Sequence, residues 1–219
     1  LSAAFAAGPL GPRSLLAGIP GSRRSLLSSA LGGGRRRAAV ALARVTPLDH
    51  HTPVRLVTLP SSPLTEAAWE PFGWLPVPDT DPRDALNRLH FEWADPNLNV
   101  IAHEYGEVQH TDRGPVCEVM YRHDTHTQAL MPLNVRSVVA VAPADLDFSS
   151  PDHLDRVRAF SLVPLDCFVL FAGTWHWGPF PLGVDAVQLL NVQGARYAED
   201  NASVDLPART GAALEITAA

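Results

Sequence analysis

The chain has 219 residues, of which 46% are hydrophobic, and it carries a formal net charge of −6. A chain of this length can bury one good core but hardly two, so a single globular domain is expected. The acidic balance gives no general attraction to nucleic acid or to an anionic membrane, and no run of about eighteen apolar residues could span a bilayer. A small molecule is therefore the expected partner.

The N-terminal stretch, residues 1–48, differs in composition from the remainder. It contains arginine but no acidic residue, among many Ala, Ser, Gly and Leu residues. Such composition is typical of transit peptides, the segment Ser22-Arg23-Arg24-Ser25-Leu26-Leu27 resembles a twin-arginine export signal, and a disordered or mis-assigned extension is the third interpretation. We predict an extension over residues 1–51 and a folded domain over 52–219. The expected location is the cytoplasm, or an organelle if residues 1–48 are a transit peptide.

Short strands dominate the secondary structure that the sequence predicts. The chain contains 20 prolines and 15 glycines, with short β-branched or aromatic runs between them. A short helix is expected from Thr65 to Gly73, and a loop or single helical turn over residues 148–158. The alternating patterns place strands at residues 54–59, 89–93, 99–105, 117–122, 127–132, 137–142, 159–163, 168–171 and 186–193. The predicted class is all-β.

The cysteines and two of the tryptophans have expected positions of their own. Cys117 and Cys167 each lie in an apolar, strand-like run, which favours two buried, reduced thiols over a disulfide. Trp175 and Trp177 flank His176, and strand alternation points them to the opposite face. We expect them to be aromatics of an outer layer or of a dimer contact.

Two segments each place a histidine beside an apolar strand pattern and a tight turn. Tyr121 and His123 are two residues apart and share one face of a strand, and a turn at residues 124 and 125 would bring Gln128 to that face. His176 follows a second apolar run. Inward side chains of a small β-barrel converge on its mouth, so we expect His123 and His176 to belong to one site.

The spacing of these residues is similar to that of the cupin superfamily. Residues 166–176 have the form D-x5-A-G-x-x-H, close to the second cupin signature. His123 and Gln128 fall where the first signature has its second histidine and its glutamate. The resemblance implies a cupin-like small β-barrel, a double-stranded β-helix or jelly roll, with one or two short helices.

A closer resemblance, spanning roughly residues 54–206, is to the ureidoglycolate lyase family. The segments that resemble its landmarks are, in order, Leu64-Thr65-Glu66-Ala67-Ala68-Trp69-Glu70-Pro71-Phe72-Gly73, Arg122-His123, Thr127-Gln128-Ala129-Leu130-Met131-Pro132, Val138-Val139-Ala140-Val141-Ala142-Pro143, Arg158-Ala159-Phe160, Trp175-His176, and Arg196 with Asp200-Asn201. Members of that family split ureidoglycolate into glyoxylate and urea, which belongs to allantoin and purine nitrogen catabolism. The resemblance also implies a homodimer, which suits a small open barrel with edge strands to cover.

The lyase reaction needs a base for the hydroxyl proton and an acid for the departing urea nitrogen. Two imidazoles in different environments suit these roles, so His123 and His176 are the expected acid/base pair, with the assignment between them left open. Gln128 would orient the amide or hydroxyl of the substrate, and Tyr121 could donate to a developing oxygen. Arg136, near the central turn, is the candidate for binding the substrate carboxylate. His126 is a rim residue that could also contact the substrate.

Departures from the family pattern keep a second interpretation open. Tyr121 stands where relatives usually carry a glutamate, and Leu170-Phe171 where they carry an N-Y pair. A ligand-binding or regulatory cupin for a small 2-hydroxy or 2-oxo acid would show such changes. Because Tyr121 and Gln128 replace two of the four cupin metal ligands, the ligand count does not favour a divalent metal, and no cofactor is expected. A metal-dependent cupin oxygenase or isomerase is the third interpretation.

Overall fold

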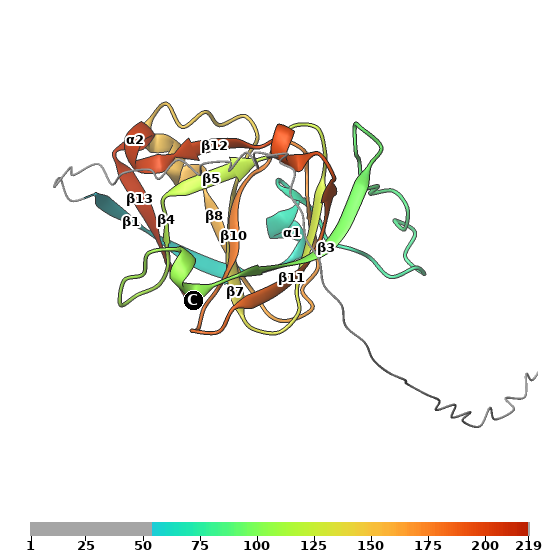
Figure 1. Cartoon of the computed structure of the whole chain (residues 1–219), viewed down its shortest axis with the longest axis horizontal. Coiled ribbons are helices and arrows are strands. Elements are labelled where there is room, and N and C mark those ends of the chain that lie inside the picture. Colours follow the sequence, from blue (N-terminus) through green and yellow to red (C-terminus); the bar gives the residue numbers. More distant parts are fainter. Residues whose placement is uncertain (1–53, 219) are drawn as a thin grey trace, which may run out of the picture. The chain divides into compact units, whose positions relative to one another are not determined.

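The computed structural model describes residues 54–218 and consists mainly of β-strands (Figure 1). The predictions for residues 1–51 concern a segment outside this range. Two sheets form the fold. The larger, eight-stranded sheet has the order β12 (Ala202–Asp205), β5 (Val119–Arg122), β10 (Trp175–Pro181), β7 (Ser137–Ala142), β8 (Arg158–Leu162), β1 (Arg55–Pro63), β13 (Ala212–Thr217) and β4 (Val116–Cys117).

The second sheet has five strands, and its side chains complete the core. Its order is β2 (Gly73–Trp74), β9 (Phe168–Leu170), β6 (Gln128–Pro132), β11 (Val187–Gly194) and β3 (Pro96–His103). The helical segments are α1 (Glu66–Trp69), α2 (Leu206–Thr210) and three 3₁₀ turns at Tyr105–Glu107, Pro151–Arg156 and Tyr197–Glu199. Two sheets with two short α-helices confirm the predicted all-β class with one or two short helices.

Strand β7 is buried on both of its faces and separates two apolar clusters. Val139 and Val141 point into the cluster that includes Leu130 and Leu189 of the second sheet. Val138 and Ala140 point the other way, into a larger cluster lined by residues of the eight-stranded sheet. Alternation along an extended strand produces this division. The chain therefore has two apolar clusters within its described residues, where its length suggested a single core.

Trp175 and Trp177 correct one expectation about exposure. Their side chains do point away from the face of His176, but only 6% and 4% of their surfaces are exposed, and both belong to the larger cluster. The indole Nε1 of Trp175 donates to the carbonyl oxygen of Leu146 at 2.8 Å. The loop around Phe148 packs edge-on against Trp175 and covers this face. The two tryptophans are therefore core residues and not an outer layer.

Several predicted elements agree with the structure, while others do not. The strand expected at residues 137–142 is β7, and Thr65 caps α1 as predicted, because its side chain accepts from the amide of Ala68. The prediction of a strand at residues 89–93 is wrong, because that segment contributes only a single β-bridge, between Phe91 and His126. Strands β10, β12 and β13 were not predicted.

Neither cysteine forms a disulfide, as expected. Cys117 is buried and Cys167 is partly buried, so the expectation of two fully buried thiols holds only for the first. Burial is the main cause that raises the pKa of the Cys117 thiol, and repulsion from Glu118 raises it further. None of the helices within residues 54–218 has the length and apolar character needed to cross a membrane.

Candidate active site

A cavity of about 770 Å³ collects most of the polar residues that the sequence singled out. Tyr121 lies in β5, and His123 is the first residue after this strand. Gln128 lies in β6 and His176 in β10. Tyr121 lies directly opposite His176 in the antiparallel pairing of β5 and β10. Directly opposite residues share one face of a sheet, so both side chains enter the cavity. The structure therefore brings together the four residues predicted to be catalytic.

His123 is held by a backbone carbonyl group from a distant part of the chain. Its Nδ1 lies 2.5 Å from the carbonyl oxygen of Asp200. A carbonyl oxygen only accepts, so the neutral ring carries its hydrogen on Nδ1 and keeps a lone pair on Nε2. The neutral form of His123 is therefore a proton acceptor at Nε2.

His176 is held in a similar way and is uncharged at neutral pH. Its Nδ1 lies 3.2 Å from the carbonyl oxygen of Thr174, which again leaves Nε2 as the acceptor. The pKa of His176 is lowered to about 4, mainly by burial and secondly by repulsion from His123. The two rings have centroids 5.4 Å apart. Two imidazoles with different surroundings thus stand side by side.

Gln128 is oriented by two other amides at the base of the cavity. Its Nε2 donates to Oδ1 of Asn191 at 2.9 Å and to Oε1 of Gln193 at 3.3 Å. The Nδ2 of Asn191 in turn donates to Oδ1 of Asn99 at 2.9 Å. With both donors directed to these amides, Oε1 of Gln128 is buried and accepts no hydrogen bond from the described residues. This oxygen therefore has unused capacity to accept a hydrogen bond.

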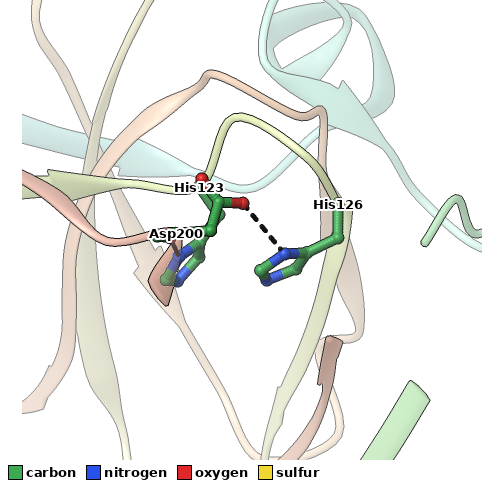
Figure 2. A group of neighbouring side chains, drawn as sticks. All are labelled: His123, His126 and Asp200. Carbon is green, nitrogen blue, oxygen red and sulfur yellow. Dashed lines mark hydrogen bonds and ion pairs between the residues drawn. The ribbon is translucent and has the colours of Figure 1, made fainter. Parts of the chain in front are cut away.

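His126 lies beside His123 (Figure 2) and is not among the residues that line the main cavity. Its ring stacks on that of His123 with centroids 4.6 Å apart, and only 2% of its surface is exposed. Its Nδ1 lies 3.2 Å from Oδ2 of Asp200. Burial, followed by repulsion from His123, lowers the pKa of His126. The residue borders a small recess that it shares with His123, Gln128 and His176.

Comparison with known proteins adds the ancestry of this site. The family model of ureidoglycolate lyase matches residues 56–210. The chain belongs to the ureidoglycolate lyase family. No match was found among curated protein sequences.

Two solved structures, both of oxalate decarboxylases, align at low similarity. A mutant of the Bacillus subtilis enzyme is 13% identical with a TM-score of 0.34, over 51% of this chain and 24% of that one. The Lactobacillus farciminis enzyme in complex with formate is 11% identical with a TM-score of 0.34, over 55% of this chain and 31% of that one. The chain thus spans less than a third of either protein.

The histidine cluster of this ureidoglycolate lyase family member offers three groups that could ligate a metal ion. His123, His126 and Asp200 have ligand atoms within 4.8 Å of one another. However, the carboxylate of Asp200 already accepts from the amides of Asp124 and Thr125, each at 2.8 Å, and from the hydroxyl of Thr125. In the cavity, Tyr121 and Gln128 offer a phenol and an amide, which are weaker ligands for a divalent cation than carboxylates or imidazoles. Neither set of residues fits a divalent cation well.

Arg136, like His126, was predicted to contact the substrate and does not line the main cavity. It is exposed on the turn between β6 and β7, where its carbonyl oxygen accepts from the amide of Leu182. Among the described residues that line the cavity there is no arginine or lysine, whereas Glu107 and Glu118 are both present. Burial, followed by repulsion from Asp205, raises the pKa of Glu118. The cavity is therefore poor in positive charge.

Sequence reasoning missed the amides that orient Gln128 and the aspartate that holds the histidines. Asn191 and Gln193 are polar residues at alternate positions of the otherwise apolar inner face of β11, a signal that could have identified them. Asp200 was noted only as a family landmark. Its partners are about 75 residues earlier in the chain, and no local pattern connects them.

Proposed function

We propose that this protein is a lyase that cleaves ureidoglycolate into glyoxylate and urea. The observation that carries the proposal is the pair of imidazoles, His123 and His176, which face one cavity with Nε2 as the acceptor atom in a member of the ureidoglycolate lyase family. Such a reaction would place the protein in allantoin and purine nitrogen catabolism.

The reaction requires two proton transfers and the cleavage of one bond. The hydroxyl O–H bond breaks as its proton leaves, and the oxygen forms a carbonyl with the carbon that bears it. The C–N bond of the same carbon breaks, and the ureido nitrogen receives a proton to give urea. No oxidant, reductant or water is consumed. Acid/base groups alone therefore suffice for the chemistry.

The environments of the two imidazoles assign their roles. His176 is uncharged at neutral pH because its pKa is lowered to about 4, so it suits the base that accepts the hydroxyl proton. The acid that protonates the departing nitrogen is then His123 in its imidazolium form, which carries a second hydrogen on Nε2 and returns to the neutral form with hydrogen on Nδ1 when it gives that proton up. Oε1 of Gln128 accepts from an N–H or O–H group of the substrate, and the Tyr121 hydroxyl donates to the developing carbonyl oxygen.

The charges of the cavity favour one end for an anionic substrate. Glu118 immediately precedes β5 and His123 immediately follows it, so the two residues stand at opposite ends of this strand. The carboxylate of the substrate is repelled by Glu118 and Glu107. The substrate therefore binds at the end where His123 and His176 lie.

The test is a direct assay of glyoxylate release from ureidoglycolate by the purified protein. We expect turnover to be lost in His176→Asn. We expect it to be retained in His153→Asn, which changes a histidine outside the cavity. No glyoxylate release by the wild-type protein over a range of substrate concentrations would reject the lyase proposal.

A binding module for a small 2-hydroxy or 2-oxo acid is the second candidate function. It is favoured by Leu170 and Phe171, which line the recess beneath the histidines where relatives carry a polar N-Y pair. Loss of polar groups would remove turnover and leave a ligand cavity. Calorimetric binding of glyoxylate without turnover of ureidoglycolate would support this candidate over the lyase.

A further inference from the structure

Asp200 contacts both histidines of the 123–126 segment through different parts of the same residue. Its backbone oxygen lies 2.5 Å from Nδ1 of His123, and its Oδ2 lies 3.2 Å from Nδ1 of His126. Figure 2 shows the carboxylate of Asp200 beside the two rings, with its contact to His126 as a dashed line. Its side chain is 9% exposed. One residue from the segment before β12 therefore contacts the same nitrogen of two imidazoles, through a hydrogen bond at His123 and at ion-pair distance, without hydrogen-bond geometry, at His126.

The carboxylate also fixes the turn that carries the histidines. Its two oxygens accept from the amides of Asp124 and Thr125 at 2.8 Å, and from the Thr125 hydroxyl. Burial opposes ionisation of Asp200, but the donors of Thr125 and Asp124 outweigh it, and the pKa of this carboxyl is lowered. Asp200 is therefore an anionic acceptor with no donor to offer.

The ring of His126 is confined on its remaining sides. It stacks between His123 and Phe91, whose ring centroid is 6.4 Å away. A side chain at Gly194 would meet the ring, since a Cβ there would lie 3.1 Å from Nδ1 of His126. His126 therefore has little freedom to turn, and it transmits the position of Asp200 to the face of His123.

We propose that Asp200 is a positioning residue of the active site, which holds His123 and His126 in the form with hydrogen on Nδ1 and directs Nε2 of His123 to the cavity. Asp200 does not line the cavity, and it acts through the two imidazoles. A partner that only accepts selects this tautomer, whereas a partner that can also donate does not. The expected effect of Asp200 on the reaction rate rests on the proposed lyase function, whereas its expected effect on the histidine tautomers does not.

Asp200→Asn is the informative substitution because it keeps the size of the side chain and the backbone oxygen. The asparagine amide nitrogen cannot accept from the amides of Asp124 or Thr125, so the segment shifts and its carbonyl moves away from His123. We expect kcat on ureidoglycolate to fall about 10- to 100-fold, as is usual for residues that orient an active group, with KM within about threefold of wild type. Asp185→Asn is the matched control, since it makes the same change at an exposed aspartate outside the cavity; its kcat should stay within about threefold.

Nitrogen-15 NMR of the histidine rings tests the inference without relying on activity or on a variant that folds. In the wild-type protein, His123 and His126 should both carry hydrogen on Nδ1 when neutral, and Asp200→Asn should increase the Nε2-protonated form of at least one. Hydrogen on Nε2 in the wild-type rings would overturn the proposal. So would an Asp200→Asn protein with unchanged tautomers. If the tautomers behave as expected but no glyoxylate is released by wild type, the lyase proposal fails and the positioning role of Asp200 stands.

Discussion

His176 lies directly opposite Tyr121 in the antiparallel pairing of β10 with β5, and both side chains line the same cavity. The two residues are separated by more than fifty positions in the chain, yet a single register places them together. Since His123 comes two residues after Tyr121 and directly follows β5, the same register also brings His123 to His176. The site thus depends on the pairing of these two strands.

Removal of either imidazole should reduce turnover strongly. His123→Asn and His176→Asn should each lower kcat on ureidoglycolate roughly 10²- to 10⁴-fold, the usual contribution of one general acid or base. Their melting temperatures should change little, because Asn fills part of the space and retains hydrogen-bonding groups. Steady-state kinetics and thermal unfolding measure the two effects.

His153→Asn is the matched control for this pair, because His153 lies in the 3₁₀ turn Pro151–Arg156, outside the cavity. It should keep wild-type kcat. Wild-type turnover in both cavity variants would mean that the acid/base assignment is wrong.

Strand periodicity predicted part of the arrangement of side chains around the cavity. Tyr121 and His123 share a face because they are two residues apart, and the turn at residues 124 and 125 brings Gln128 into the same cavity, as expected. His176 was found because its segment resembles a family motif. Local pattern therefore predicted which side chains face inward, but it could not predict which inward residues of other strands meet them.

The parts that escaped prediction have physical reasons. Strand β10 contains Gly178 and Pro179 within its span, and a register irregularity lies between Trp177 and Phe180, so its alternation is broken. The segment at residues 89–93 alternates like a strand but has only one bridge. The role of Asp200 depends on contacts between distant segments, which periodicity does not describe.

Arg136→Met tests whether the substrate carboxylate uses this arginine. The sequence favoured Arg136 as a carboxylate clamp, but the residue is exposed and does not line the cavity. We expect KM for ureidoglycolate to stay within about twofold of wild type, since loss of a distant exposed charge has a small effect in water. A rise in KM of tenfold or more would restore the clamp and show that Arg136 reaches the substrate in solution.

Neutralising Glu118 should improve binding of the anionic substrate. Glu118 lines the cavity, and a unit charge about 10 Å from the substrate carboxylate, at an effective dielectric of about 40, contributes roughly 0.8 kcal/mol of repulsion. Glu118→Gln should therefore lower KM about two- to fivefold at low salt, and the difference should shrink as salt is added.

Glu70→Gln removes an exposed carboxylate outside the cavity and serves as the control for net charge. If both substitutions change KM equally, the effect comes from the charge of the whole protein and not from the cavity. An increase in KM for Glu118→Gln alone would instead mean that Glu118 contacts the substrate and accepts a hydrogen bond from it.

The protein should form a homodimer through the outer face of β3. This strand is at the edge of the five-stranded sheet, and its outward residues Leu98 and Val100 are 66% and 57% exposed. Exposed apolar side chains in a row on an edge strand favour association with a second copy. Light scattering should therefore give the mass of a dimer for the wild-type protein, and Leu98→Glu with Val100→Glu should shift it to a monomer.

Val184→Glu is the control for this pair and should leave the dimer intact, because Val184 lies in a loop and is 81% exposed. A monomer mass for wild type at all concentrations would contradict the dimer, and a dimer that survives the double substitution would place the interface elsewhere.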